Sequence, residues 1–303
     1  MATLVPEPTG IPSWKLVKRQ PYPQAEFQLE LKLPDLRLQK QYGRIDLLTI
    51  ESNSDPNIGP GAGPQSGSAA TEIIRHGEIV SHDLTLQGSN YTFLVKIELD
   101  GGESLAIYKP RDGEAPLWDF PTGTLYKREY CAYLLSEILG WDIIPFTIIR
   151  DGPYGIGSVQ QFVEHDPKQN YYTLEQGCAD QLRVIACFDL VANSTDRKAN
   201  HLLMGAEGKI WSIDHGLTFH EEMKVRTVIW DFSSEPIPSH LLQSLTNLRE
   251  QLNSAADSQP TLIQELVSVL PPEEVDGLKR RIDWVLEEGI FPGLPGRNRR
   301  QRY

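Results

Sequence analysis

Apolar and polar residues alternate along short runs in the first half of the chain, between residues 78 and 162. A period of two is typical of half-buried β-strands, and turn residues such as those at 87–90 and 100–102 separate the runs. The pattern predicts a three-stranded meander followed by a hairpin. The predicted strands cover residues 78–86, 91–98, 105–108, 147–150 and 157–162. An antiparallel sheet is therefore expected in this part of the chain.

Helical spacing of apolar residues marks the rest of the chain. Between the meander and the hairpin, Tyr130, Leu134 and Ile138 fall on one face of a predicted helix over residues 125–139, which Gly140 ends. After residue 173 the apolar positions recur mainly at helical spacing. Four apolar stripes predict further helices, at residues 182–191, 241–252, 262–270 and 272–286. The sequence thus predicts an α+β fold, with an antiparallel sheet plus one helix followed by a mainly helical region.

Composition sets both ends of the chain apart from this pattern. Residues 27–33 alternate as a half-buried strand does, and residues 42–50 could supply a second strand, but the sequence assigns residues 1–50 no function. Residues 51–72 are rich in Gly, Pro, Ser and Asn, which predicts a flexible linker. At the other end, residues 297–303 form a short basic tail that we expect to be disordered.

Charge and cysteine content narrow the class of protein. The net charge of -12 and the sequence pI of about 5.1 argue against nucleic acid or an anionic membrane surface as the main partner. The three cysteines form neither a Cys-x-x-Cys pair nor an even framework, which favours a reducing compartment. The N-terminus lacks a signal-peptide pattern, and no apolar run is long enough for a transmembrane segment. We therefore expect a soluble, cytoplasmic protein.

Two acidic residues in the stretch 188–216 are the strongest candidates for chemistry. Asp196 lies in a loop after a predicted helix, and Asp214 begins an Asp-x-Gly after the second of two short predicted strands, 201–204 and 209–213. Taken alone, each residue is explained by the frequent occurrence of Asp in turns and at helix caps. Together they would face one small space. Phosphoryl transfer needs such a pair, because one carboxylate orients the attacking hydroxyl and another holds magnesium on the phosphates.

Residues in the predicted sheet could complete this site on the phosphate side. Gly88, Ser89 and Asn90 form a turn whose N–H groups could cradle phosphates, although an ordinary hairpin turn would look the same. Lys109 ends the third strand, either as a solvated edge residue or as an amine that pairs with phosphates. Glu129 lies near the start of the following helix, where it either complements the helix dipole or pairs with Lys109.

The order of these motifs resembles the phosphatidylinositol 3-/4-kinase-like superfamily, and more closely a branch of small bacterial proteins similar to type II phosphatidylinositol 4-kinases. The resemblance covers roughly residues 75–290. It rests on Gly88-Ser89-Asn90, Tyr108-Lys109-Pro110, Arg128-Glu129 with Ile144-Pro145, Asn193-Ser-Thr-Asp196-Arg197 and Ile213-Asp214-His215-Gly216. It implies a bilobal kinase-like fold, with an N-lobe at residues 73–164, a C-lobe at residues 165–296, and a hinge at Val163 that meets adenine.

The same resemblance implies a role for each site residue. ATP with magnesium or manganese would be bound between the lobes. Lys109 would contact the phosphates, and Glu129 would steady Lys109. Asp196 and its neighbour Arg197 would be catalytic, and Asp214 would be a metal ligand.

One position departs from the family pattern. The family places a metal-binding Asn five residues after the loop Asp, but this chain has His201 there and Asn200 one residue earlier. Either His201 ligates the metal, or a shifted loop lets Asn200 do so, or the second metal site is lost. Imidazole suits magnesium less well than an oxygen ligand does, so turnover could be slow or absent. The small bacterial branch shares this His, which favours an altered site over random decay.

These features predict an ATP- and magnesium-dependent phosphotransferase that transfers the γ-phosphate to an acceptor hydroxyl. A phosphoinositide headgroup usually demands a basic loop near the cleft. The segment after Asp214 offers only Lys224 and Arg226, which Glu221 and Glu222 balance. A protein or a small molecule is therefore at least as plausible an acceptor as a lipid. The sequence fixes neither the acceptor nor an oligomeric state.

Two alternatives stay open at this point. The substitution at His201 motivates a catalytically weak kinase-fold protein that binds nucleotide and acts through partners. A nucleotidyl transferase would use the same groups with the nucleotide reversed. Hydrolases are disfavoured, because the sequence contains neither His-Glu-x-x-His nor Gly-x-Ser-x-Gly.

Overall fold

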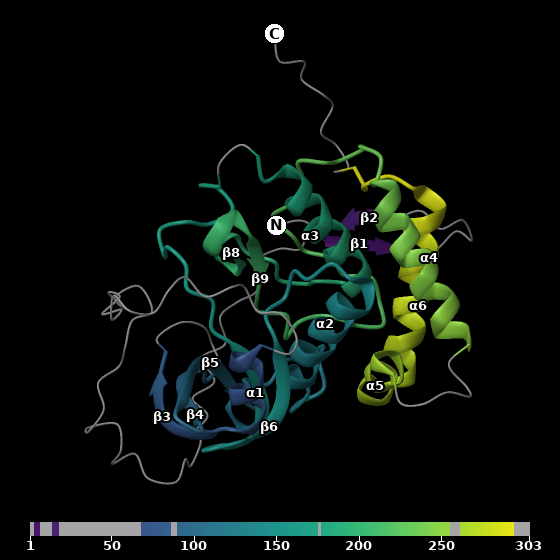
Figure 1. The fold of residues 1–303 in the computed structure, drawn as a ribbon. Coiled ribbons are helices and arrows are strands. Elements are labelled where there is room, and N and C mark those ends of the chain that lie inside the picture. The colour runs from purple at the N-terminus through teal and green to yellow at the C-terminus, as the bar shows by residue number, and fades with distance from the viewer. Residues whose placement is uncertain are drawn as a thin grey trace.

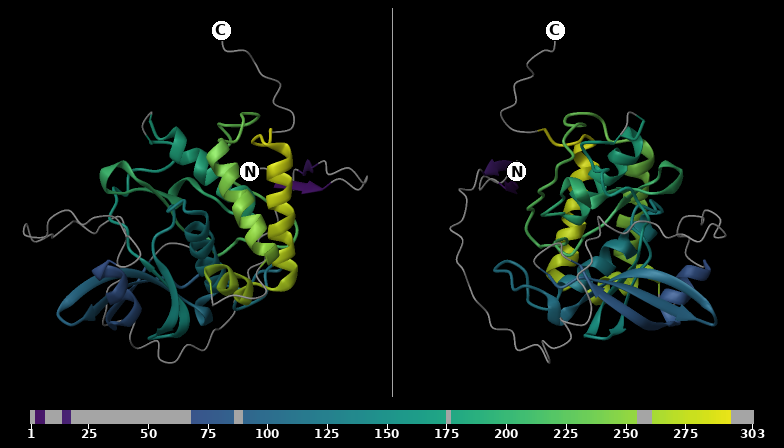
Figure 2. Two further views of the ribbon diagram at one scale, coloured as in Figure 1. Left: turned by 45° about the vertical axis from the view of Figure 1, so that its right-hand side comes forward. Right: turned by 90° about the vertical axis from the view of Figure 1, so that its left-hand side faces the viewer.

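The chain folds into two lobes in the computed structural model, which describes residues 3–6, 14–17, 68–85, 90–174, 177–254 and 261–293 (Figure 1). A β-sheet dominates one lobe and helices dominate the other, and the two further views in Figure 2 show the same separation. The predicted α+β fold class is confirmed. The strands predicted at 27–33 and 42–50, most of the predicted linker and the basic tail lie outside the described residues.

The N-lobe is built on a five-stranded sheet with the order β3-β4-β5-β7-β6, in which all neighbours are antiparallel. Its strands are β3 (Glu78–Leu84), β4 (Phe93–Leu99), β5 (Gly102–Pro110), β6 (Thr147–Gly152) and β7 (Gly155–Gln161). Successive side chains of a strand point to opposite faces. Tyr108 is fully buried on one face of β5, so Lys109 projects from the other face. Gly157 of β7 permits close approach to β5, because a Cβ there would collide with the carbonyl of Lys109.

Two helices pack against this sheet. Helix α2 (Leu125–Leu139) has the predicted bounds and contacts β6 and β7, whereas α1 (Ala69–His76) contacts β4 and β5. The sequence predicted only one helix in this lobe and assigned the first residues of α1 to the linker. An eight-residue helix is marginal by itself, so its stability comes from its caps and its packing. Ser68 accepts a hydrogen bond from Thr71 N, and Arg150 donates to Ile74 O and Gly77 O.

The C-lobe is mainly helical, as predicted. Its helices are α3 (Ala179–Ala192), α4 (Ser239–Ser254), α5 (Leu262–Val269) and α6 (Pro272–Glu288). Helix α6 packs against α3 and α4, and the short strands β8 (Leu202–Met204) and β9 (Ile210–Ser212) form a hairpin at the predicted place. Two short strands near the N-terminus, β1 (Thr3–Pro6) and β2 (Trp14–Val17), pair with each other. Among the helices of the described ranges, none combines the length and the apolar character that crossing a membrane requires.

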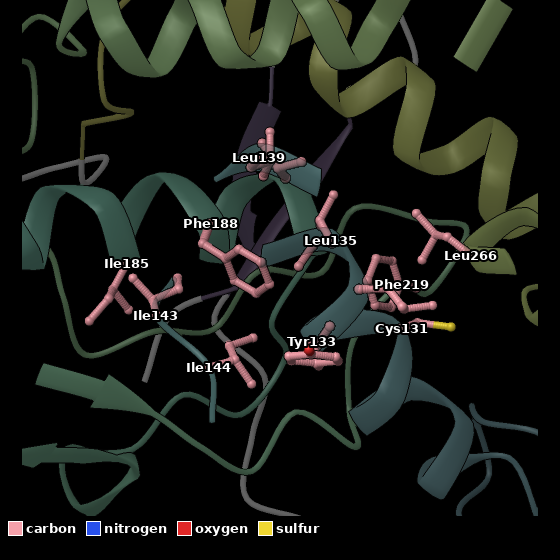
Figure 3. Packing of buried hydrophobic residues seen from close by; sticks show 14 of the residues in the cluster. Cys131, Tyr133, Leu135, Leu139, Ile143, Ile144, Ile185, Phe188, Phe219 and Leu266 are labelled. Atoms are coloured by element: carbon pink, nitrogen blue, oxygen red, sulfur yellow. The ribbon is translucent and has the colours of Figure 1, made fainter. Parts of the chain in front are cut away.

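One continuous hydrophobic core joins the lobes. Helix α2 contributes Cys131, Leu135 and Leu139 to it, and Phe188 of α3 packs in the same cluster (Figure 3). Fully burying one such side chain stabilises a fold by about 1.5–3 kcal/mol. Helix α2 is thus fixed between the sheet and the C-lobe, and it carries Glu129 into the space between them.

Candidate active site

A cleft of about 360 Å³ lies between the lobes, within the size range of ligand-binding cavities. Residues from both lobes line it. Nine of the residues predicted from the sequence are among them: Asn90, Lys109, Glu129, Val163, Asp196, Arg197, Asn200, His201 and Asp214. Gly88 and Ser89 lie outside the described residues. Asn90 Oδ1 accepts a hydrogen bond from Ala115 N at 2.7 Å, so this side chain also anchors the loop after β5.

The ammonium of Lys109 joins the two lobes at the centre of the cleft. It forms ion pairs with Glu129 Oε1 of α2 and with Asp214 Oδ1, the latter at 2.8 Å. The other oxygen of Glu129 accepts a hydrogen bond from His215 N at 2.8 Å. Burial by itself would lower the pKa of Lys109, but the charges of Asp214 and Glu129 raise it above its usual value. Lys109 is therefore a permanent cation, and the predicted pairing with Glu129 is present.

The two acidic partners of Lys109 differ in their surroundings. Glu129 is only 3% exposed, and its burial raises the pKa of its carboxyl, which the charge of Lys109 opposes. Lys109 holds the pKa of Asp214 well below its usual value, although the Asp214 side chain is 48% exposed. Asp214 also has a φ of 61°, a left-handed conformation that Asp tolerates better than most residues. The site thus presents an ionised carboxylate that is fixed in direction yet open to the cleft.

His201 contacts Asp214 from the side opposite to Lys109. His201 Nε2 lies 3.2 Å from Asp214 Oδ2, and its Nδ1 accepts a hydrogen bond from Lys198 N at 3.4 Å. Burial lowers the pKa of His201 to about 4, so the imidazole is neutral. Its proton then resides on Nε2 and is donated to Asp214. This arrangement supports a positioning role for His201, with Asn200 beside it in the same cleft.

The oxygen donors of the cleft fit magnesium only if phosphates share the ion. Within the part of the chain that the structure describes, no group of three or more His, Cys, Asp or Glu residues could hold a metal ion. Magnesium usually keeps several waters and takes one or two carboxylates together with substrate phosphates. Asp214 and Asp196 both line the cleft and offer carboxylates of this kind. The donor set therefore suits a metal that arrives with a nucleotide.

Asn193 connects the end of α3 to the segment that follows Asp214. It ends the helix in a left-handed conformation with a φ of 57°. Its amide donates to His220 O at 2.8 Å and to Glu222 O at 2.7 Å, and its Oδ1 accepts from Lys224 N at 2.8 Å. One buried side chain thus holds residues 220–224 next to the loop that contains Asp196.

Backbone hydrogen bonds fix the loop on both sides of Asp196. Thr195 N donates to Leu217 O at 3.0 Å, and Arg197 N donates to Arg226 O at 2.9 Å. The backbone on both sides of Asp196 is thereby held by residues that follow Asp214 in the chain.

Arg197, which the sequence predicts to be catalytic, lies beneath the loop at the edge of the cleft. The side chain is 1% exposed. Its guanidinium contacts both carboxylate oxygens of Asp189 of α3, through Nε to Oδ2 and Nη2 to Oδ1, and donates to Ile213 O at 2.8 Å and to His215 Nε2 at 2.9 Å. A buried cation requires such partners because desolvation is costly. These contacts link Arg197 to α3 and to the residues on both sides of Asp214.

Sequence reasoning missed the residues that complete this buried network. Thr227 Oγ1 donates to Asp189 Oδ2 at 2.9 Å, and Ser212 Oγ lies 3.1 Å from His215 Nε2. The available signal was Asp189 itself, a charged residue inside the apolar stripe of α3. Such a residue requires a buried partner.

Comparison with known proteins identifies the family of this chain. A family model described as phosphatidylinositol 3- and 4-kinase matches residues 126–267, which include Glu129, Asp196 and Asp214. Protein Rv2133c of Mycobacterium tuberculosis (strain ATCC 25618 / H37Rv) is 34% identical over 259 residues, covering 74% of this chain and 91% of that protein. The chain belongs to the phosphatidylinositol 3-/4-kinase-like superfamily. The bacterial source of this relative agrees with the branch that the motifs predicted.

Membership of the phosphatidylinositol 3-/4-kinase-like superfamily makes the chain a kinase-like phosphotransferase. Among solved structures, the crystal structure of CtkA, a proinflammatory kinase of Helicobacter pylori, matches with a TM-score of 0.40 and 13% sequence identity. That match covers 71% of this chain and 94% of CtkA.

Proposed function

We propose that this phosphatidylinositol 3-/4-kinase-like protein is an ATP-dependent enzyme that uses magnesium or manganese and transfers the γ-phosphate to an acceptor hydroxyl. One observation carries the proposal. The Lys109 ammonium is held between Glu129 and Asp214 in a cleft that also contains the Asp196 carboxylate. Phosphoryl transfer depends on positioning and on neutralising charge, and these groups supply both.

The cleft also contains an apolar surface that fits the adenine ring. Val163, Leu203 and Ile213 line the cleft, and the buried Trp211 packs with them in one small hydrophobic cluster. Ile107 of β5 lines the same cleft from the N-lobe. A flat apolar base would lie between these side chains. Its phosphates would then extend toward Lys109.

The transfer step assigns one task to each polar residue. Asp196 accepts the proton of the acceptor hydroxyl while the hydroxyl oxygen attacks the γ-phosphorus. The bond between the γ-phosphorus and the bridging oxygen breaks, and ADP leaves with that electron pair. Lys109 neutralises charge on the phosphates, and Glu129 fixes its direction. Magnesium bound to Asp214, with an oxygen of Asp196 or Asn200 nearby, would neutralise further phosphate charge.

The acceptor in this proposal is a protein or a small molecule. Lys224 is only 14% exposed, and its ammonium contacts His220 Nε2 at 2.9 Å and Glu222 at 3.5 Å. Arg226 Nη2 lies 3.9 Å from Asp196. Both cations of the segment 217–237 thus have partners within the protein. This disfavours recognition of a polyanionic lipid headgroup, which requires cations that face outward.

The first test measures ATP consumption by the purified protein with magnesium or manganese, together with mass spectrometry of the protein and of candidate acceptors. We expect ADP to form and the modified product to gain one phosphate. Asp196→Ala should reduce turnover by at least about 100-fold, whereas Asp180→Ala, which changes a side chain that is 99% exposed, should not. Undiminished turnover in Asp196→Ala would overturn the proposal. Gain of a nucleotidyl group would establish a nucleotidyl transferase instead.

One contact favours a second candidate function, a catalytically weak protein that binds nucleotide and acts through partners. Both carboxylate oxygens of Asp214 have donors, Lys109 on one and His201 on the other. A metal ion must compete with these donors. His201→Asn tests the point by restoring an amide at the family's metal-binding position. A wild-type protein that binds ATP without turnover, and a His201→Asn variant that gains turnover, would support this second function.

A further inference from the structure

Two neighbouring apolar side chains are exposed in the loop between β5 and α2. They belong to Leu117 and Trp118, which we call the apolar tip, and Trp118 is 72% exposed. Burying a ring of this size stabilises a fold, so folding gives no reason to leave it in water. Exposed apolar residues that adjoin one another are typical of interaction sites, whereas single ones are common on any surface.

The loop is anchored on both sides of the apolar tip. Before the tip, Ala115 N donates to Asn90 Oδ1 at 2.7 Å. After it, Phe120 is buried and packs edge-on against His220 of the C-lobe, with ring centroids 5.5 Å apart. The exposure of the tip is therefore a fixed feature of the fold.

The apolar tip lies beside the segment 220–224, which is bonded to the loop that contains Asp196. Lys224 Nζ lies 5.4 Å from the centroid of the Trp118 ring. The backbone N–H of Lys224 donates to Asn193 Oδ1. Asn193 precedes Asp196 by three residues, which span at most about 11 Å. A short extended polypeptide with its hydroxyl at Asp196 can therefore reach the tip.

Acidic side chains are exposed next to the apolar tip. In the segment 217–224, the exposed charged side chains are those of Glu221 and Glu222. Lys224, the cation of that segment, is largely covered, and its ammonium lies 3.8 Å from Asp119 and 3.5 Å from Glu222. A partner that carries Lys or Arg next to an apolar side chain complements this surface, whereas an anionic membrane does not.

We propose that the apolar tip is a docking site for the acceptor, and that the acceptor is a polypeptide with an apolar side chain next to a Lys or Arg. This inference rests on the proposed phosphotransferase function and names the class of its acceptor. The apolar side chain packs on Trp118, and the cationic side chain pairs with Glu222. A Ser, Thr or Tyr hydroxyl of the same polypeptide then lies at Asp196.

Synthetic peptides test this inference. Each peptide holds one Ser, Thr or Tyr in a background of Gly and Ala, and a Leu-Lys pair lies at a different distance from it in each peptide. We expect wild type to phosphorylate peptides of one preferred spacing. Replacing the Leu of those peptides by Gly should lower kcat/KM about 30-fold, a loss typical of a contact with an anchoring tryptophan.

The selectivity for Leu over Gly should vanish in Leu117→Ser/Trp118→Ser. Val80→Ser/Leu262→Ser is the matched control, because it removes two exposed apolar side chains that lie on β3 and α5 and do not line the cleft. This control should keep the wild-type selectivity.

Glu222→Lys supplies an independent test, because it leaves the apolar tip in place. Wild type should prefer Leu-Lys peptides to Leu-Glu peptides by up to about 5-fold, and less at high salt. The variant should reverse this preference. Glu287→Lys, which changes an exposed carboxylate on α6, should keep it.

Three outcomes would overturn the inference and leave the proposed function standing. The first is unchanged selectivity in Leu117→Ser/Trp118→Ser. The second is phosphorylation of a small hydroxyl compound with no phosphopeptide formed. The third is sedimentation with phosphatidylcholine and phosphatidylserine vesicles that the same variant loses, in place of peptide selectivity, which would make the tip a membrane contact. A wild-type protein that forms no ADP with magnesium or manganese would overturn both proposals.

Discussion

Two carboxylates hold the ammonium of Lys109, and only one of them belongs to the N-lobe. Glu129→Gln would keep the shape of that partner and remove its charge, while an amide oxygen could still accept from His215 N. A hydrogen bond to a charged group contributes about 1.5–3 kcal/mol, so we expect kcat/KM for ATP to fall about 10- to 100-fold. ATP consumption at varied ATP concentration measures this loss.

Glu137→Gln is the control for that variant, because Glu137 lies on the same helix, α2, and does not line the cleft. It should leave kcat/KM within about 2-fold of wild type. An equal loss in both variants would mean that the effect comes from α2 as a whole, and the assignment of Glu129 would be wrong.

The sequence predicted individual site residues unevenly. Lys109 and Glu129 followed from the order of strand, lysine and helix, and the structure brings their side chains together. The contacts of Arg197 could not be predicted in the same way, because its acceptors are Asp189, a backbone carbonyl and an imidazole that meet only in the folded chain. The proton position on His201 depends likewise on a backbone N–H.

Helix α2 is held in place by a buried ion pair next to Glu129. Arg128 is 1% exposed, and its guanidinium donates to Glu274 Oε1 of α6 at 2.5 Å and to Thr218 O at 2.6 Å. Removing one partner of a buried pair leaves an uncompensated charge, which costs about 3–5 kcal/mol. We expect Glu274→Ala to lower the free energy of unfolding by this amount, as measured by urea denaturation.

The double variant Arg128→Met/Glu274→Leu separates charge burial from packing. Apolar replacements of similar volume often restore the stability lost when a buried ion pair is broken. The double variant should therefore unfold at a higher urea concentration than Glu274→Ala. Glu273→Ala, a change in the same turn of α6 at an exposed position, serves as the control. A cost below about 1 kcal/mol for Glu274→Ala would show that water reaches the pair.

At the scale of elements, the apolar periodicity predicted the bounds of α2 correctly, because Gly140 adopts the left-handed conformation that ends the helix. It did not predict α1. This helix follows residues rich in Gly, Pro and Ser, and their composition led us to predict a linker that continued to residue 72. The signals for α1 were the N-cap Ser68 and the apolar pair Ile73 and Ile74. A search for apolar periodicity over a longer window did not reveal them.

The whole molecule brings together groups that lie far apart in the sequence. Lys109 and Asp214 are 105 residues apart, and no local pattern predicts their contact. The resemblance in motif order predicted that they share a site, whereas the sequence patterns alone predicted the elements that carry them. The continuous core across the lobes explains how the contact is kept, because α2 packs against both the sheet and the C-lobe helices.

A ligand that contacts both lobes should stabilise the whole fold. At a concentration 100 times its Kd, a ligand that binds only the folded state contributes about 2.7 kcal/mol, and for a domain of this size that corresponds to roughly 5–10 °C in Tm. We expect ATP with magnesium to produce such a rise, and a smaller one without magnesium, because Asp214 can hold the ion only together with the phosphates.

Asp214→Ala tests that expectation directly. The variant should retain the magnesium-independent part of the ATP response and lose the additional rise, because Lys109 keeps Glu129 as its partner while the proposed metal ligand is gone. Asp276→Ala changes an exposed carboxylate on α6, far from the lining of the cleft, and should respond as wild type does. Thermal melting of the three proteins, with and without magnesium, measures the difference. If Asp214→Ala gains as much from magnesium as wild type, the ion is held elsewhere and the assignment of Asp214 is wrong.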